Sequence, residues 1–94
     1  MPKIGDRVGA LMDRNDLTKT VRFFGYGVYN GDLPCEGLGG FSNPNITLDN
    51  GKIVWGCECW WSPENNVKEK LDWYKENGYE IVDVDVDEER SKAA

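Results

Sequence analysis

The side chains of this sequence best suited to hold a small molecule are aromatic rings, arginines and asparagine amides. A ring stacks on a planar group, a guanidinium pairs with phosphate, and an amide completes the polar contacts. The candidates that we select for these roles are Tyr26, Tyr29, Trp60, Trp61, Arg7, Arg22, Asn43 and Asn45. Together they predict a site for a planar, anionic ligand.

Catalysis is harder to build from this chain. It contains no histidine, so it lacks the imidazole base and the usual Ser/His and Cys/His nucleophile pairs. Carboxylates could exchange protons, but no nucleophile is paired with a base. We therefore expect no catalytic residue and no cofactor, and we rank an enzyme behind a binding protein.

The three cysteines, Cys35, Cys57 and Cys59, could in principle bring three thiolates to a zinc ion. A structural zinc site needs four ligands and usually a C-x₂₋₄-C spacing, which this chain lacks. Cys57 and Cys59 are two residues apart, a poor spacing for a disulfide. We expect buried, reduced cysteines with no metal, as is typical of a cytoplasmic protein.

The charge balance also limits the partners. The chain has 11 basic and 17 acidic residues, a net charge of −6, which argues against binding nucleic acid. Valines and aspartates alternate over residues 82–87, which predicts a solvated edge strand, with a calcium site or a cationic partner as the alternatives. Residues 1–62 are nearly neutral, so Arg7 and Arg22 could still present local positive charge to an anion.

Two features of the predicted strands affect the site. A continuous strand through Trp60 and Trp61 would place these rings on opposite faces, so at least one indole would lie near the surface unless the following helix covers it. An exposed indole could stack on a ligand or anchor a partner protein. Gly25 and Gly27 would leave a groove on the other strong strand, filled by a ring such as Trp55 or by a ligand.

The elements that must position these residues are short. We predict a turn that runs into a short strand over residues 3–11 and a strand over residues 21–29, the latter ended by the sequence Asn-Gly-Asp, with a polar loop over residues 12–20 between them. Residues 33–44, rich in glycine, proline, serine and asparagine, predict a long loop. Asn50-Gly51 predicts a hairpin turn between strands over residues 45–48 and 52–60.

A helix follows the hairpin. Ser62 is expected to cap it, and Val67, Leu71 and Tyr74 form one apolar stripe along it. Gly78 is expected to end the helix. A last strand over residues 79–87 and a frayed acidic tail over residues 88–94 complete the chain.

These elements predict a single domain over residues 1–94. The fold class is mostly β with one helix, in the form of a small, SH3-like, partly open antiparallel barrel with a C-terminal helix and an edge strand. A three- or four-stranded sheet with the helix packed across it is the competing architecture. No segment has the apolar length of a signal peptide or a membrane span.

Three strings carry a resemblance over residues 4–64: GDRVGA at residues 5–10, FGYGVYNGD at residues 24–32 and VWGCECWW at residues 54–61. With them, the chain resembles a group of short bacteriophage-encoded proteins. The resemblance implies a small protein that acts in the cytoplasm of the infected host. By analogy with other phage proteins, an anti-defence role would follow.

We therefore expect a non-enzymatic protein that sequesters a nucleotide-derived immune signal. A chain this short encloses little volume, so the site could lie between subunits of a homo-oligomer. The alternative is a protein-interaction module whose exposed aromatic residues dock on a host protein. We expect no nucleic acid and no membrane as partner.

Overall fold

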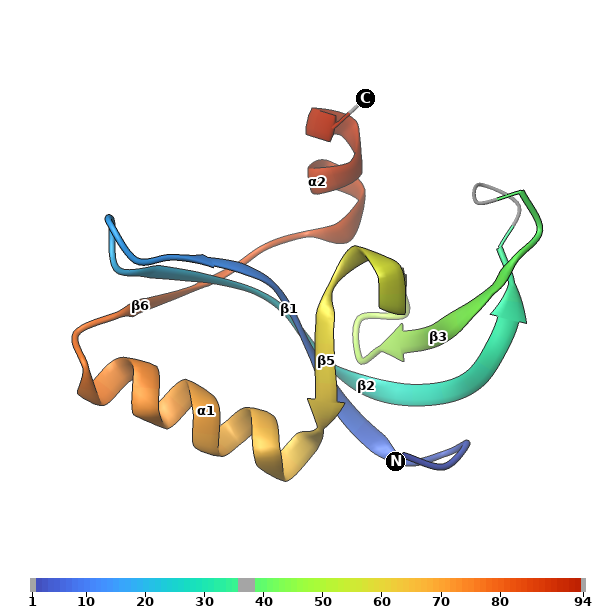
Figure 1. The fold of residues 1–94 in the computed structure, drawn as a ribbon, viewed down its shortest axis with the longest axis horizontal. Coiled ribbons are helices and arrows are strands. Elements are labelled where there is room, and N and C mark those ends of the chain that lie inside the picture. The colour runs from blue at the N-terminus through green and yellow to red at the C-terminus, as the bar shows by residue number, and fades with distance from the viewer. Residues whose placement is uncertain (1, 36–38, 94) are drawn as a thin grey trace.

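The computed structural model describes residues 2–35 and 39–93, which form six strands, two α-helices and a short 3₁₀ helix (Figure 1). In chain order these elements are β1 (Arg7–Asn15), β2 (Thr20–Pro34), β3 (Ser42–Leu48), β4 (Ile53–Trp55), the 3₁₀ helix η2 (Gly56–Glu58), β5 (Trp60–Pro63), α1 (Glu64–Glu76), β6 (Glu80–Asp83) and α2 (Val86–Ala93).

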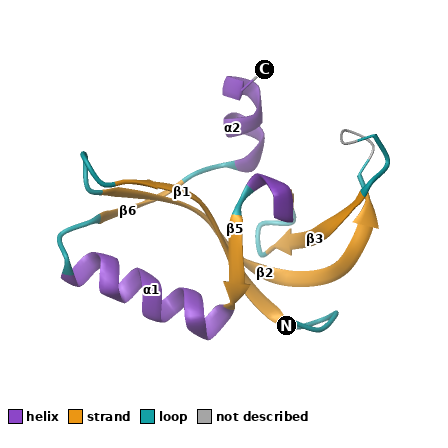
Figure 2. Cartoon of the chain, in the orientation of Figure 1, coloured by secondary structure: helices purple, strands orange, loops and turns teal. Residues whose placement is uncertain are grey.

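The strands form one open sheet in the order β4-β3-β2-β1-β5, with antiparallel pairing between neighbours. β6 lies outside this order and pairs in parallel with the first residues of β2. The prediction of a mostly β fold with antiparallel strands and a C-terminal helix is confirmed, and the sheet does not close into a barrel. Figure 2 shows the strands at the centre of the molecule, with α1 and α2 at its margins and η2 beside β5.

β2 is longer than predicted because glycine bulges let it continue where we expected it to end. Gly31 has φ of +91°, and the register with β3 shifts by one residue between Tyr29 and Asp32. A second shift in register lies near Gly25, whose φ is +131°. The predicted end of the strand at residues 30–32 is therefore wrong. The predicted loop over residues 33–44 shrinks to residues 35–41, and its residues 36–38 lie outside the described residues.

The predicted loop over residues 12–20 is also mostly strand. β1 continues to Asn15, and a tight turn over residues 16–19 leads into β2. The side chain of Asn15 accepts hydrogen bonds from the backbone N–H groups of Leu17 (2.9 Å) and Thr18 (3.1 Å). The residues at this end of the hairpin are mostly exposed, so polar side chains are compatible with the strand conformation there.

The hairpin at Asn50-Gly51 is present, but its second strand is shorter than predicted. Thr47 pairs with Ile53 and Asn45 with Trp55, and then η2 interrupts the chain. The Glu58 carboxylate accepts a 3.0 Å hydrogen bond from the backbone N–H of Trp55 and so stabilises this turn. Trp60 begins a separate strand, β5, which pairs with β1. The prediction of one continuous strand through residue 60 is wrong.

Two apolar clusters lie on the two faces of the sheet. The inner core contains buried residues of four strands and α2: Val8, Ala10, Phe24, Ile46, Leu48, Val54 and Val86. The helix core packs α1 on the sheet through Leu11, Val21, Phe23, Val67, Leu71 and Tyr74. The predicted apolar stripe of the helix is thus confirmed.

The predicted ends of α1 have different outcomes. Ser62 belongs to β5, and Pro63 precedes the helix without a capping side-chain hydrogen bond. The predicted serine cap is therefore wrong, because β5 holds this residue in an extended conformation beside Gly9. At the other end Gly78 has φ of +84°, as expected for a residue that ends a helix.

The C-terminal segment is a helix where we expected a strand and a tail. β6 ends at Asp83, and α2 runs from Val86 to Ala93. Asp85 accepts a 3.0 Å hydrogen bond from the backbone N–H of Glu88, and Val86 is buried in the inner core. The predicted alternation over residues 82–87 therefore breaks at Asp85. Neither helix of the described chain is long and apolar enough to cross a membrane.

Candidate functional site

The four predicted aromatic site residues do not meet in one place. Tyr29 and Trp61 stack on each other with ring centroids 5.0 Å apart and packed against the inner core. Tyr26 packs edge-on against Phe23 of the helix core. Trp60 remains the exposed ring, with 45% of its surface accessible. Of the predicted stacking platforms, Trp60 is therefore the one best placed to receive a ligand.

The two predicted arginines are engaged within the protein. Arg7 holds both carboxylate oxygens of Asp49, at 2.6 and 2.8 Å, and an oxygen of Glu64 at 2.7 Å. These hydrogen bonds raise the pKa of Arg7 and lower the pKa of Asp49. Arg22 forms a two-point pair with Asp13 and lies 3.5 Å from Glu89. Neither guanidinium is well placed to bind phosphate as well.

The two predicted asparagines, Asn43 and Asn45, lie on β3, where it pairs with β2. Asn45 is buried, and its side-chain oxygen accepts a 2.8 Å hydrogen bond from Asn30. Asn30 donates a second one to Thr47 at 2.7 Å. Asn43 lies on β3 opposite Leu33. These residues stabilise the β2–β3 pair.

We predicted a groove at Gly25 and Gly27, and at Gly27 the backbone of β3 fills that space. A Cβ at Gly27 would lie 2.2 Å from the carbonyl oxygen of Thr47, so β3 itself fills that space. At Gly25 a Cβ would meet nothing within 4 Å. Trp55 is therefore not the group that fills the gap.

The cysteines differ in exposure. Cys57 is exposed, so the prediction of buried cysteines is wrong at this position, because η2 turns it out of the sheet. Cys59 is largely shielded, and burial raises the pKa of its thiol to about 12. Among the described residues no cluster of cysteines and carboxylates has the arrangement of a metal site.

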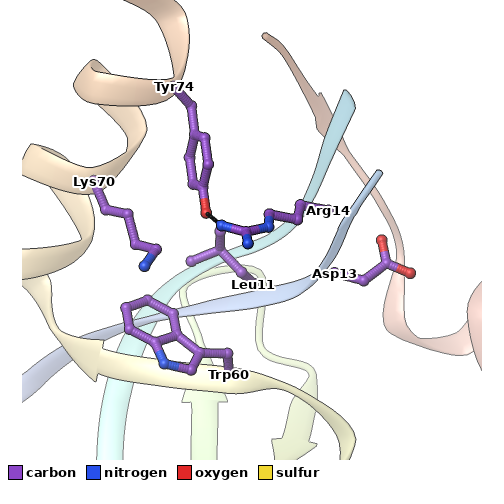
Figure 3. A pocket seen from close by; sticks show the side chains of 6 residues that line it. All are labelled: Leu11, Asp13, Arg14, Trp60, Lys70 and Tyr74. Carbon is purple, nitrogen blue, oxygen red and sulfur yellow. Dashed lines mark hydrogen bonds between the residues drawn. The ribbon is translucent and has the colours of Figure 1, made fainter. Parts of the chain in front are cut away.

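One cavity of the described chain lies between α1 and the β1–β5 edge of the sheet. It has a volume of about 210 Å³, and its lining residues come from β1 (Leu11, Asp13, Arg14), β5 (Trp60) and α1 (Lys70, Tyr74). Figure 3 shows Arg14, Lys70 and Trp60 around this space, with the Tyr74 hydroxyl directed at Arg14. Pairing of Leu11 with Trp60 sets the indole beside β1, and the apolar stripe of α1 sets Lys70 above it.

The electrostatics of this cavity differ from those around Arg7. Arg14 donates a 3.0 Å hydrogen bond to the uncharged Tyr74 hydroxyl, which raises the pKa of Arg14, and its nearest carboxylate, Asp16, is 3.5 Å away and exposed. The ammonium of Lys70 lies 4.6 Å from the centre of the Trp60 ring. In the described structure its contacts are with rings and none is an ion pair. Two cations with spare hydrogen-bonding capacity thus flank one exposed indole.

A second hollow of about 510 Å³ adjoins the first and shares Arg14, Lys70 and Tyr74 with it. Its other lining residues are Asn66, Glu69 and Trp73, from α1. Trp73 is 55% exposed and packs edge-on against Tyr74. We call the two hollows together the α1 groove.

Sequence reasoning missed most of the α1 groove. Arg14 fell in a segment predicted to be a loop, and Lys70 and Tyr74 were treated only as parts of a helix. The usable signal was Trp73, a large apolar residue outside the stripe formed by Val67, Leu71 and Tyr74. An indole on the polar side of a helix marks a surface that could receive a ligand or a partner.

Comparisons with family models, with curated proteins and with solved structures gave no match to this chain.

Proposed function

We propose that this protein is a non-enzymatic binding protein that holds a planar, nucleotide-like anion in the α1 groove. The observation that carries this proposal is the exposed ring of Trp60 beside the guanidinium of Arg14 and the ammonium of Lys70. The base of the ligand stacks on the indole, and its phosphate lies between the two cations.

Stacking of a base on the Trp60 ring should be more favourable than the present contact of Lys70 with that ring. An exposed cation–π contact such as that of Lys70 with Trp60 stabilises by about 0.5–1 kcal/mol. Stacking of a base on an aromatic side chain contributes about 1–3 kcal/mol. The flexible lysine stem lets the ammonium move from the ring to a phosphate oxygen, where it keeps a favourable partner.

The size of the cavity limits what it holds. A site that buries most of a drug-sized ligand has a volume of about 300–1,000 Å³. The cavity at Trp60, at about 210 Å³, is smaller and fits one ring system. The rest of the ligand must extend into the adjoining hollow. Every groove residue comes from one chain, so this proposal does not need the homo-oligomer expected from the sequence.

The biological role that we propose is sequestration of a nucleotide-derived signal, as an anti-defence sponge in the cytoplasm of an infected host. The support for this role is the resemblance to short phage proteins, together with a groove whose lining contains no serine, cysteine or histidine. Sequestration requires a ligand that is held and released unchanged.

The test is a binding titration with nucleoside monophosphates, cyclic dinucleotides and cyclic ADP-ribose isomers, followed by calorimetry and by the melting temperature. We expect at least one to bind, to raise the melting temperature and to be recovered intact after heat denaturation. Trp60→Ala should weaken that binding, and Phe41→Ala, which changes a 75% exposed ring outside the groove, should not. Absence of binding across the panel contradicts the proposal, and recovery of a converted product identifies an enzyme.

The second candidate is a protein-interaction module, favoured by the two exposed indoles Trp60 and Trp73 on one surface. Exposed aromatic anchors are typical of protein interfaces. This candidate predicts that no nucleotide binds and that Trp60→Ala and Trp73→Ala both abolish capture of a host protein. Phe41→Ala again serves as the control.

A further inference from the structure

We infer that the α1 groove takes a dinucleotide, with one base on Trp60, the second base on Trp73 and the linking phosphate at Arg14 and Lys70. This inference rests on the proposed function and specifies its ligand class.

The two indoles lie on either side of the same pair of cations. Arg14, Lys70 and Tyr74 line both hollows, whereas Trp60 lines only the first and Trp73 only the second. A series of contacts joins them: Lys70 is 4.6 Å from the Trp60 ring and 5.9 Å from the Tyr74 ring, and Tyr74 is 5.4 Å from Trp73 between centroids. Along this series the ammonium of Lys70 comes after the Trp60 indole and before the Tyr74 and Trp73 rings, so a cation stands between the two indoles.

That order matches the chemistry of a dinucleotide. In such a ligand a phosphodiester joins two nucleosides, so the negative charge lies between the two planar bases. A mononucleotide, with a single base, would leave one of the exposed indoles without a partner. Both indoles are about half exposed, and they can receive a base without displacing core residues.

The second hollow also contains groups that can distinguish bases. Glu69 and Asn66 line it beside Trp73. A carboxylate accepts hydrogen bonds, and guanine presents two adjacent donors, its N1–H and its 2-amino group, on one edge. Adenine presents one donor beside a lone pair on the corresponding edge. We therefore expect guanine to be preferred at the Trp73 position.

The experiment compares the dissociation constants of GMP, GpG and ApA for the whole chain by calorimetry. One additional stacked base should make GpG bind about tenfold or more tightly than GMP. Trp73→Ala and Trp60→Ala should each reduce the affinity for GpG to about that for GMP, because each removes one of the two stacking platforms. Glu69→Gln should reduce the preference for GpG over ApA, and Phe41→Ala should change nothing.

The outcomes separate this inference from the proposed function. If GMP binds and GpG binds no more tightly, or if Trp73→Ala leaves the affinity for GpG unchanged, the dinucleotide inference is overturned and the binding function stands. If GMP, GpG and ApA all fail to bind, and the wider panel fails as well, the proposed function is overturned with it. Because Trp73 is exposed, an unchanged melting temperature confirms that the Trp73→Ala protein is folded.

Discussion

The cations of this protein fall into two groups that sit in different electrostatic surroundings. Arg7 has three hydrogen bonds of 2.8 Å or less to the carboxylates of Asp49 and Glu64. Arg14 has one hydrogen bond to the Tyr74 hydroxyl and one exposed carboxylate, Asp16, at 3.5 Å, and Lys70 lies over an indole. A guanidinium that already holds two carboxylates gains little from binding a phosphate. It must first release these carboxylates, which are negatively charged like the phosphate. The difference teaches that the partners of a cation, more than its position in the sequence, decide whether it can bind an anion.

The largest effect should follow removal of the available guanidinium. Arg14→Met should weaken nucleotide binding by about tenfold or more, since a charge-assisted hydrogen bond contributes about 1.5–3 kcal/mol. The melting temperature should change little, because the side chain of Arg14 is about half exposed, at 53%. Calorimetry and thermal denaturation on the same preparation check both statements. Equal nucleotide affinities of Arg14→Met and the wild type would show that Arg14 does not bind the phosphate.

The next largest effect should follow removal of Arg22, a guanidinium that is paired with a carboxylate, and it should lower the free energy of unfolding. Arg22→Met leaves Asp13 unpaired and removes one cation beside the buried carboxylate of Glu89. We expect a loss of about 1 kcal/mol in the free energy of unfolding, which is at the upper end for an exposed pair, because Arg22 and Asp13 are partly exposed and only Glu89 is buried.

Urea denaturation measures the stability of Arg22→Met, and calorimetry should show its ligand affinity unchanged. Conversely, a large loss of affinity in a folded Arg22→Met protein would place the ligand at Arg22, in the hollow that Asp13 and Arg14 also line.

A smaller effect distinguishes Lys70 from Arg14. Lys70→Met keeps an aliphatic chain over Trp60 but removes the charge, so binding should weaken by several-fold and its dependence on salt concentration should become less steep. Titrations at two ionic strengths measure this change. Lys75→Met, on the same helix but outside the lining of the α1 groove, is the matched control. An identical salt dependence in Lys70→Met and the wild type would exclude Lys70 from phosphate binding.

The smallest effect is a difference in pH dependence between the two groups. Hydrogen bonds to Arg7 lower the pKa of Asp49, and those to Lys68 and Arg7 lower the pKa of Glu64. A depressed carboxyl pKa in the folded state stabilises the protein above the unfolded pKa, and this contribution disappears as the pH falls through the folded pKa. The stability difference between the wild type and Arg7→Met should therefore vanish in acid, whereas Arg14→Met should melt close to the wild type across the whole range. Melting temperatures between about pH 7 and pH 2 test this, and a parallel loss in both variants would contradict it.

Local patterns in the sequence predicted the features that local chemistry controls. The turn at Asn50-Gly51, the apolar stripe of α1 and its end at Gly78 depend on a few neighbouring residues, and all three are present. At Gly31 the same reasoning was wrong, because a glycine with positive φ serves either to end a strand or to insert a bulge. Only the pairing with β3 decides between these outcomes.

The candidate site was harder to predict because its selection depends on contacts between distant residues. Arg7 is separated from Asp49 by 42 residues and from Glu64 by 57, so its engagement cannot be read from the sequence around it. Trp60 was among the predicted stacking platforms and is exposed, but its neighbours Arg14 and Lys70 come from two other elements. Residue type thus identified one ring of the groove, and the fold supplied the rest.

The parallel pairing of β6 with β2 has a consequence for the time that folding takes. Thr20 pairs with Glu80 and Phe23 with Asp83, so this contact closes a segment of about 60 residues. β1 and β5 are likewise brought together across a long stretch of chain, as shown by the pairing of Leu11 with Trp60. Chains dominated by such distant pairings fold in milliseconds to seconds, far more slowly than helical bundles of similar size. Stopped-flow refolding of this protein should therefore be slow for a chain of its length.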